Sequence, residues 1–427
     1  MLKFDDAFEI VMRSACRLGT ERVDIDCALN RVLAEDVVSD IDIPLFNKSA
    51  MDGFACRRAD LANELTVIET VPAGTMPKRT IGQNQCAKIM TGAVVPEGAD
   101  CVIMVEYTQS VTENRIRFIG KDGTDNRAAT VRERIKDVPD NICLKGEDIK
   151  KGDVVLRAGQ LLKPQHIAVL ASVGCVQPVV SLQPRVGIIA TGDELVEPSE
   201  KPAAYQIRNS NGLQLAAQVA RASAIATNYG KVGDTKEAIE AMLKRAMIEN
   251  DVVIVSGGVS VGDYDLVRQI LQRNSVKLLF EKVATKPGRP TVFGIYSSCV
   301  VRDASCETLR DTQYAIRDTK FVFGLPGNPV STFVMFELLV KPFLFKMMGH
   351  DFKPTISHRQ LEKTITRKKT ERDTWLPVVF TDDDKVAKIE YHGSAHINAL
   401  CKADGLICIP AGTEQIKEGN TVAVRQI

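Results

Sequence analysis

Residues 251–273 read DVVIVSGGVSVGDYDLVRQILQR, and this stretch indicates most directly how the chain folds. A continuous apolar run leads into a glycine-rich turn and then into an amphipathic segment. An apolar run without alternation is typical of a strand buried on both faces, as in a parallel sheet covered by helices. The same succession of strand and helix extends from residue 183 to a long apolar helix expected over residues 330–348. We therefore predict a doubly wound α/β domain.

The sequence on either side of this region has other patterns. A helical period occupies residues 4–15, short β-like runs separated by turns fill residues 50–140, and strand patterns return after residue 354. Residues 142–180 combine a turn, a strand and a helix, and we expect them to pack on the N-terminal helix. The predicted parts are a discontinuous N-terminal domain (1–46 plus 142–180), a β-rich domain (47–141), the α/β domain (181–350) and a C-terminal β-domain (351–427).

Composition limits the classes of function. The 427 residues carry 55 Lys and Arg against 54 Asp and Glu, and aromatic residues make up 5%. Such a balance disfavours a nucleic-acid binder, which needs a basic surface or stacking aromatics. No apolar run approaches the ~18 residues of a membrane span, and the N-terminus lacks signal-peptide features. Eleven cysteines without a CxxC pair are expected to be small buried thiols in a reducing compartment, so we expect a cytoplasmic protein.

Three predicted strands end in loops of a kind that binds anions, at residues 191–194 (TGDE), 256–263 (SGGVSVGD) and 325–329 (LPGNP). Glycines allow close approach of a ligand to the backbone, and a following helix offers unpaired N–H groups. Each loop alone is more often a tight βα turn, but three at one sheet edge favour an anionic ligand. None matches GxGxxG or GxxxxGK[ST], which disfavours a dinucleotide enzyme or a P-loop NTPase.

Charged side chains accompany these loops. The acids are Asp193, Glu194, Asp234, Asp263 and Asp265. Like charges beside a phosphate site repel unless a cation lies among them, and hard oxygen ligands suit Mg²⁺, although Asp263 and Asp265 could simply cap a helix.

A basic turn, EKVATKPGRP, brings Lys282, Lys286 and Arg289 together. It could hold a second oxyanion or be a solvated hairpin tip. The basic run over residues 363–372 is better explained as a solvated edge or a linker.

Six motifs in fixed order resemble those of the MoeA and gephyrin E-domain family, the molybdopterin molybdenumtransferases. They are NKSAMDGFA (47–55), MTGAVVPEGAD (90–100), ATGDELVEP (190–198), SGGVSVGDYD (256–265), KPGRPTVFG (286–294) and GLPGNPVS (324–331). The first two would be ordinary turns on their own. The resemblance covers nearly the whole chain and implies that family's four-part subunit.

The resemblance implies a reaction in which adenylylated molybdopterin binds with Mg²⁺, molybdate is inserted at the dithiolene sulfurs, and the adenylate is released as AMP. It implies catalytic roles for Asp52, Thr91, Glu194, Asp234, Asp265, Lys282 and Lys286, with Glu194, Asp234 and Asp265 also holding the metal. It implies substrate contacts from Gly192, Ser256, Gly257, Gly258, Ser260, Pro287, Gly327, Asn328, Ser331 and Ser394. It further implies a homodimer whose cleft is shared by two subunits, a molybdopterin adenylyltransferase as upstream partner, and cofactor-accepting enzymes downstream.

The chain departs from the family pattern at two places. The family has an arginine two residues beyond the aromatic residue of the C-terminal domain's first strand, whereas Trp375 is followed by Leu376 and Pro377, so Arg372 is a candidate replacement. Residues 297–320 also interrupt two strands that a short turn joins in the family. Two rival functions are a molybdopterin adenylyltransferase, which the extra domains disfavour, and a non-catalytic scaffold or molybdate-binding protein, which the set of polar residues disfavours.

Overall fold

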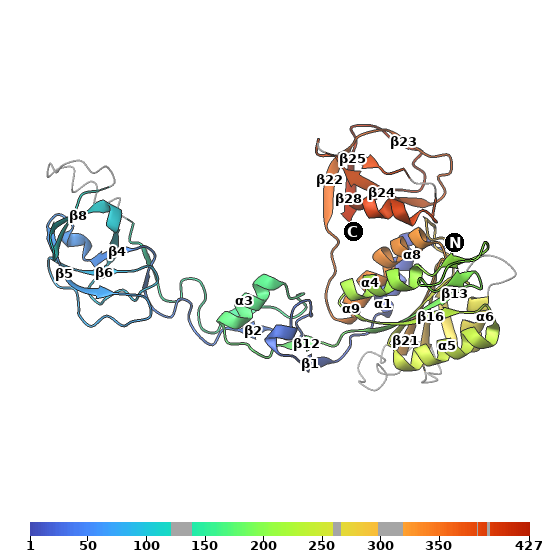
Figure 1. The fold of residues 1–427 in the computed structure, drawn as a ribbon, viewed down its shortest axis with the longest axis horizontal. Helices are drawn as coiled ribbons and strands as arrows, with labels where there is room; N and C mark the ends of the chain where they lie inside the picture. The colour runs from blue at the N-terminus through green and yellow to red at the C-terminus, as the bar shows by residue number, and fades with distance from the viewer. Residues whose placement is uncertain (121–138, 259–265, 298–318, 382, 391–392) are drawn as a thin grey trace. The chain divides into compact units, whose positions relative to one another are not determined.

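The computed structural model describes residues 1–120, 139–258, 266–297, 319–381, 383–390 and 393–427 (Figure 1). The chain forms two compact units. Unit 1 contains residues 1–35, 158–164 and 177–427, and unit 2 contains residues 36–157 and 165–176. The boundaries of the four predicted domains remain a prediction.

The centre of unit 1 is a six-stranded sheet in the order β16-β13-β17-β21-β20-β18. The first four of these strands are parallel, and β20 is antiparallel to both of its neighbours. All five residues of β17 are buried, as the uninterrupted apolar run predicts. The strands are β13 (Arg185–Thr191), β16 (Ile225–Val232), β17 (Val252–Ser256), β18 (Val276–Phe280), β20 (Val292–Ser297) and β21 (Thr319–Leu325).

Helices cover both faces of this sheet. Val252 and Ile254 share one apolar core with residues of α1, α4 and α9, whereas Val253 and Val255 share the other core with α5 and α6. Alternate residues of one strand thus enter opposite cores, which confirms the doubly wound α/β prediction. The helices are α1 (Phe4–Ser14), α4 (Asn211–Arg221), α5 (Lys236–Glu249), α6 (Leu266–Arg273) and α9 (Lys341–Met347).

The long helix predicted over residues 330–348 has an irregular centre. It consists of α8 (Pro329–Met335), a π-helical turn, η5 (Phe336–Val340), and α9. Pro342 has no N–H to donate to the preceding turn, and its ring crowds that turn, which explains a wider turn immediately before it.

The C-terminal part of unit 1 is a second six-stranded sheet, in the order β19-β24-β25-β22-β28-β26, with β26 also pairing β24. One strand, β19 (Thr285–Lys286), comes from the α/β region and pairs in parallel with β24. The KPG turn therefore follows a strand of this sheet and is not a solvated hairpin tip. The other strands are β22 (Ile356–Leu361), β24 (Asp373–Phe380), β25 (Lys385–Lys388), β26 (Gly405–Ile409) and β28 (Thr421–Gln426), and the short β23 (Ile365–Thr366) pairs β27 (Gln415–Ile416).

Unit 1 also contains two short strand pairs and a short 3₁₀ helix. The strand β1 (Thr20–Arg22) pairs β12 (Val179–Ser181), and β14 (Leu195–Val196) pairs β15 (Ile207–Arg208). The 3₁₀ helix η6 (Ile397–Lys402) lies between β25 and β26 in the chain.

Unit 2 is organised around a third six-stranded sheet, in the order β7-β4-β6-β5-β9-β8. Its strands are β4 (Gly53–Cys56), β5 (Glu64–Val71), β6 (Gln85–Ile89), β7 (Cys101–Met104), β8 (Thr108–Thr112) and β9 (Arg115–Phe118). Two short ladders accompany it, β2 (Val37–Val38) with β11 (Val154–Leu156) and β3 (Lys48–Ser49) with β10 (Ile142–Cys143). The helix α3 spans Pro164–Ser172.

None of the nine described cysteines forms a disulfide. Only Cys56, Cys86 and Cys101 are buried, so the prediction that most cysteines are buried is wrong. An apolar sequence context does not decide burial, because one face of a strand or loop still meets solvent. Within the described ranges, each helix is too short or too polar to cross a membrane.

Candidate active site

The three glycine loops meet at the carboxyl edge of the central sheet. Ser256 is in register with Ala190 on one side and with Leu325 on the other, so the three strands end at the same level. The Gly257 N–H donates to the Leu325 carbonyl at 3.1 Å. A Cβ on Gly257 would lie 2.5 Å from the Thr191 carbonyl oxygen, so only glycine allows the loops to approach this closely.

These loops line a cavity of about 610 Å³. It contains eight of the residues predicted to form the site: Gly192, Glu194, Asp234, Ser256, Gly257, Gly258, Gly327 and Asn328. They come from positions up to 136 residues apart in the chain, and the parallel register brings them together.

Asn211, the first residue of α4, ties two of the loops together. Its side-chain NH₂ donates to Ser256 Oγ at 2.8 Å and to the Gly327 carbonyl at 2.7 Å. Because the Gly327 carbonyl can only accept a hydrogen bond, the atom of the Asn211 side chain that faces it must be the NH₂ nitrogen and not the oxygen. One buried side chain thus sets the spacing of the second and third loops.

Carboxylates crowd the first loop. The Asp193 N–H donates to Asp234 Oδ2 at 3.3 Å, and the Asp234 N–H donates to Asp193 Oδ1 at 3.0 Å. Burial raises the pKa of Asp234, and the charges of Asp193 and Glu194 raise it further, against the lowering effect of the Asp193 N–H. This end of the cavity therefore favours a cation, or protonation of one acid.

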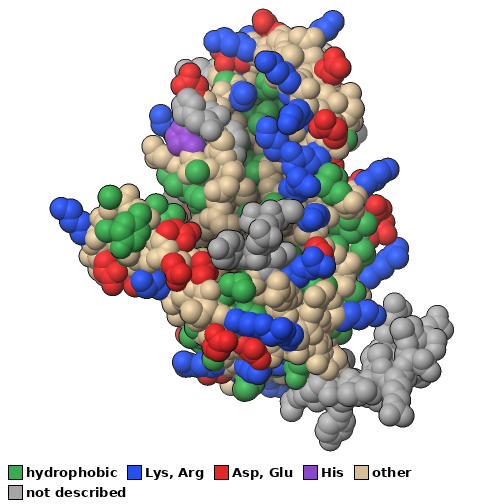
Figure 2. Space-filling view, turned by 90° about the vertical axis from the view of Figure 1, so that its right-hand side faces the viewer, with side chains coloured by type: hydrophobic (Ala, Val, Ile, Leu, Met, Phe, Trp, Pro, Cys, Tyr) green, Lys and Arg blue, Asp and Glu red, His purple; other side chains and the backbone are tan. Residues whose placement is uncertain are grey.

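A second cavity of about 560 Å³ adjoins the first and shares Pro290, Pro326 and Asn328 with it. Four cationic side chains line it and no carboxylate is among its described lining residues; the cations are Lys286, Arg289, Arg372 and Lys388. Lys and Arg side chains also gather over the C-terminal β-domain, at the top of Figure 2. Four cations around one pocket favour an oxyanion.

Three further predicted residues lie in the second cavity, namely Pro287, Ser331 and Ser394. The Asn328 side-chain NH₂ donates to Ser394 Oγ at 2.8 Å, and the Val330 N–H donates to the Ser394 carbonyl at 3.0 Å. The start of α8 is thereby tied to the C-terminal β-domain, and Asn328 lies at the boundary between the two cavities.

In unit 2, two predicted residues form a hydrogen-bonded pair. Asp52 Oδ1 accepts from the Thr91 N–H at 2.6 Å and from Thr91 Oγ1 at 2.9 Å. These bonds lower the pKa of Asp52, the backbone bond most, so the carboxylate stays ionised at neutral pH. The motifs NKSAMDGFA and MTGA thus meet, and both side chains of the pair are exposed.

Not every predicted residue is found at the two cavities. Ser260, Asp263 and Asp265 lie outside the described residues, as does most of the 297–320 segment. Lys282 is not among the residues lining either cavity, although its carbonyl accepts from the Leu2 N–H at 3.2 Å.

Sequence reasoning assigned no role to several residues that line the cavities, among them Thr191 and Asn211 in the first and Lys388 in the second. Thr191 stands beside a glycine that the reasoning did use. Asn211 and Lys388 carried no signal, because each reaches its cavity from an element whose position depends on the tertiary fold.

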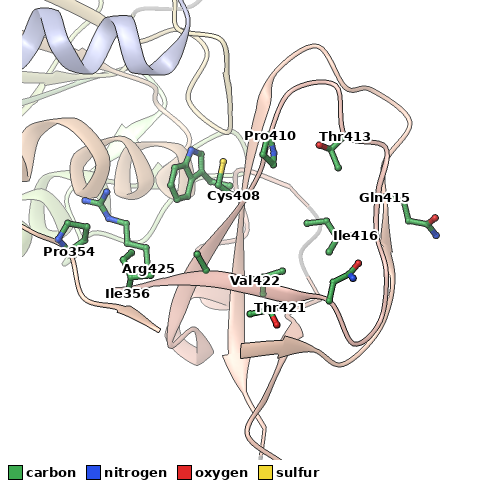
Figure 3. Close-up of a pocket in the computed structure, with 13 residues that line it drawn as sticks. Pro354, Ile356, Cys408, Pro410, Thr413, Gln415, Ile416, Thr421, Val422 and Arg425 are labelled. Atoms are coloured by element: carbon green, nitrogen blue, oxygen red, sulfur yellow. The ribbon is translucent and has the colours of Figure 1, made fainter. Parts of the chain in front are cut away.

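A third cavity, of about 530 Å³, lies in the C-terminal β-domain and contains none of the predicted residues (Figure 3). Burial raises the pKa of Cys408 in its wall to about 12, so this thiol stays protonated. No nucleophile is therefore available from Cys408 at neutral pH.

Comparison with known families gives matches along most of the chain. Residues 2–174 match the model of the MoeA N-terminal region (domain I and II), residues 187–346 the probable molybdopterin binding domain, and residues 361–427 the MoeA C-terminal region (domain IV).

Individual relatives agree with these matches. A molybdopterin molybdenumtransferase of Staphylococcus epidermidis is 34% identical, and one of Staphylococcus aureus is 32% identical, each over 98% of this chain and 94% of the relative. The crystal structure of the molybdopterin biosynthesis moeA protein from Pyrococcus horikoshii OT3 superposes with a TM-score of 0.79 at 30% identity, covering both chains completely.

Proposed function

Because the chain belongs to the MoeA family and is a molybdenumtransferase of molybdenum-cofactor biosynthesis, we propose that its two adjoining cavities hold its two substrates. The acidic, glycine-lined cavity takes the phosphate-bearing part of adenylylated molybdopterin, and the cationic cavity takes molybdate. The observation that carries this division is the shared boundary at Asn328: Glu194, Asp234 and one cation, Arg208, line one side, and four cations with no described carboxylate line the other.

The backbone at Gly258 and Gly327 suits the phosphates, since these glycines leave it open to a ligand, whereas the Gly257 N–H already donates to the Leu325 carbonyl. Lys286, Arg372 and Ser394 suit an oxyanion. Ser394 Oγ accepts from Asn328, so its own proton remains available for donation. Arg372 shares the cavity with Lys286, which supports its role in place of the family arginine absent after Trp375. Molybdate would thus be held next to the pterin dithiolene and not within the phosphate site.

The residues at the first loop fit Mg²⁺. Glu194 and Asp234 offer hard oxygen atoms, and burial together with the charges of Asp193 and Glu194 raises the pKa of Asp234, an effect that a bound cation would oppose. Among described residues, no group of three His, Cys, Asp or Glu side chains is arranged to hold an ion. The resemblance adds Asp265, which lies outside the described residues, and Mg²⁺ usually completes its shell with substrate phosphates and water. When bound, Mg²⁺ would neutralise the diphosphate during loss of AMP.

The exposed Asp52–Thr91 pair supports a homodimer in which unit 2 of one subunit completes the cleft of the other. Three large apolar side chains near this pair are also exposed, namely Met51 (41%), Met90 (46%) and Val105 (44%). Met51 and Met90 directly precede Asp52 and Thr91 in the chain. The Val105 N–H donates to the Asp52 carbonyl, so Val105 lies next to Asp52 in the fold. An apolar rim around an ionised carboxylate suits a surface that is covered in the assembly.

The reaction itself is tested with purified protein, adenylylated molybdopterin, molybdate and Mg²⁺. AMP release and formation of active cofactor are followed together. We expect both from the wild type, greatly reduced turnover from Glu194→Gln, and wild-type turnover from Glu240→Gln, a carboxylate on α5 away from both cavities. Full activity of Glu194→Gln would refute the assignment of the acidic cavity.

The shared cleft is tested by mixing two inactive variants, Asp52→Ala and Glu194→Gln. Random reassociation makes half of the dimers mixed, and each mixed dimer has one intact cleft, so about a quarter of wild-type activity should return. A mixture that stays inactive although sedimentation shows exchanged dimers would contradict this arrangement. We further propose that the upstream partner is a molybdopterin adenylyltransferase and that cofactor-accepting enzymes act downstream, all in the cytoplasm.

A further inference from the structure

Among the described residues that line the acidic cavity, two buried polar atoms have no hydrogen-bond partner. They are Thr191 Oγ1 and Asn211 Oδ1. Thr191 is 4% exposed and Asn211 is 9% exposed, and both residues line the cavity. Buried polar atoms are nearly always hydrogen-bonded, so two unpaired atoms in one cavity point to a ligand that supplies their partners.

The position of the Thr191 hydroxyl is set by the glycine loops. A Cβ on Gly257 or Gly258 would lie 2.9 Å or 3.0 Å from Thr191 Oγ1. Thr191 Oγ1 is buried in the cavity wall behind these two glycines, and any side chain at either of them would crowd it. The glycines therefore let a molecule in the cavity come close to Thr191.

Asn211 restricts the chemistry of the partner. Its NH₂ is used by Ser256 Oγ and the Gly327 carbonyl, so its unpaired atom is an oxygen that can only accept. An ionised phosphate has no proton to donate. The partner of Asn211 Oδ1 must carry an N–H or O–H group.

We propose that Thr191 and Asn211 are specificity-determining residues that hydrogen-bond an uncharged polar group of the substrate, beside the anion-binding loops. This inference rests on the proposed function and deepens it. On adenylylated pterin the suitable groups are a ribose hydroxyl or the amide-like edge of the pterin ring. Both offer a donor for Asn211 Oδ1 and an acceptor or donor for the Thr191 hydroxyl.

Thr191→Val tests this directly, because valine keeps the shape and removes only the unpaired hydroxyl. Affinity of the full-length chain is measured by calorimetry for two separate probes, AMP and molybdopterin without the nucleotide. We expect affinity for one probe to fall about 2- to 10-fold, the size of one hydrogen bond, with an unchanged or higher melting temperature. Thr191→Ser, which keeps the hydroxyl, should bind both probes as the wild type does.

The matched control is Thr291→Val. Thr291 is fully buried, and its hydroxyl donates to the Gly288 carbonyl at 2.7 Å. The same chemical change should there lower the melting temperature and leave both affinities unchanged.

Each pattern of results decides the proposal. Loss confined to AMP supports the ribose hydroxyl, and loss confined to molybdopterin supports the pterin edge. Equal loss for both probes would assign the hydroxyl to phosphate, the part they share, and would overturn the proposal. Wild-type affinity of Thr191→Val for both probes would overturn this inference alone, whereas a wild-type chain that binds neither probe would overturn the proposed function and this inference with it.

Discussion

Replacing Lys286 with alanine should weaken the use of molybdate selectively. Lys286 lines the cationic cavity, next to Arg289, Arg372 and Lys388, and is absent from the residues that line the acidic cavity. Losing one hydrogen bond to a charged group costs about 1.5 to 3 kcal/mol, equivalent to roughly a 10- to 150-fold change in affinity. Lys286 is exposed and three other cations remain, so we expect the lower end, about 10-fold.

The assay follows AMP release as a function of molybdate concentration at saturating adenylylated molybdopterin. The molybdate concentration for half-maximal rate should rise about 10-fold, and high molybdate should restore most of the rate. Binding of adenylylated molybdopterin, measured without molybdate, should be nearly unchanged. Lys277→Ala is the matched control, because Lys277 is also an exposed lysine, nine residues earlier in the chain, and does not line either cavity.

Two outcomes would refute this reasoning. Collapse of pterin binding with an unaltered molybdate dependence would assign Lys286 to the phosphate site. An equal effect of Lys277→Ala would show that general positive charge, and not the lining of one cavity, determines molybdate use.

Three other substitutions should change the stability of the protein in directions that follow from the structure. Thr91→Val removes the side-chain hydrogen bond to Asp52, one of the two bonds that lower the pKa of this carboxyl. The stabilisation from a lowered pKa is present above the usual aspartate pKa and is lost on acidification. The melting temperature of the variant should therefore be below that of the wild type near pH 6, and the two should converge below about pH 3. Asp234→Asn removes a carboxyl whose pKa burial raises, so its ionised form destabilises the fold at neutral pH. Thermal scans of the variant should show a higher melting temperature at pH 7 and no gain at acid pH, and activity assays should show much reduced turnover. A lower melting temperature at pH 7 would contradict this sign. Gly53→Ala would place a Cβ 1.9 Å from the Ile103 carbonyl oxygen, and calorimetry should show unit 2 destabilised by about 1 to 3 kcal/mol.

Local pattern was sufficient for the elements and for part of the site. The helix at Phe4–Ser14 buries Ala7 and Val11, four residues apart, as its period predicts. The buried strand Val252–Ser256 follows from an apolar run long enough for one strand. The prediction that glycine loops meet also needs only local information, because consecutive parallel strands of one sheet point their carboxyl ends to the same edge.

Local pattern was insufficient wherever distant segments pair. The KPG turn looks like a hairpin tip in sequence, but Thr285 and Lys286 pair with Asp373 and Thr374, 88 residues further along the chain. The hydrogen bonds of a two-residue strand leave no periodic signal in either partner.

What the sequence by itself determined is the family, the α/β class and most residues of the acidic loops, since these depend on motifs and on strand patterns read within short windows. Only the tertiary structure decided that Arg372 and Lys388 join Lys286 around one cavity. It alone also decided that Thr191 and Asn211 each have an unpaired buried atom in the wall of the acidic cavity. The physical reason is that side-chain proximity follows from sheet order and from the docking of the C-terminal β-domain. Both are set by the sum of many weak packing contacts, to which no single residue pattern corresponds.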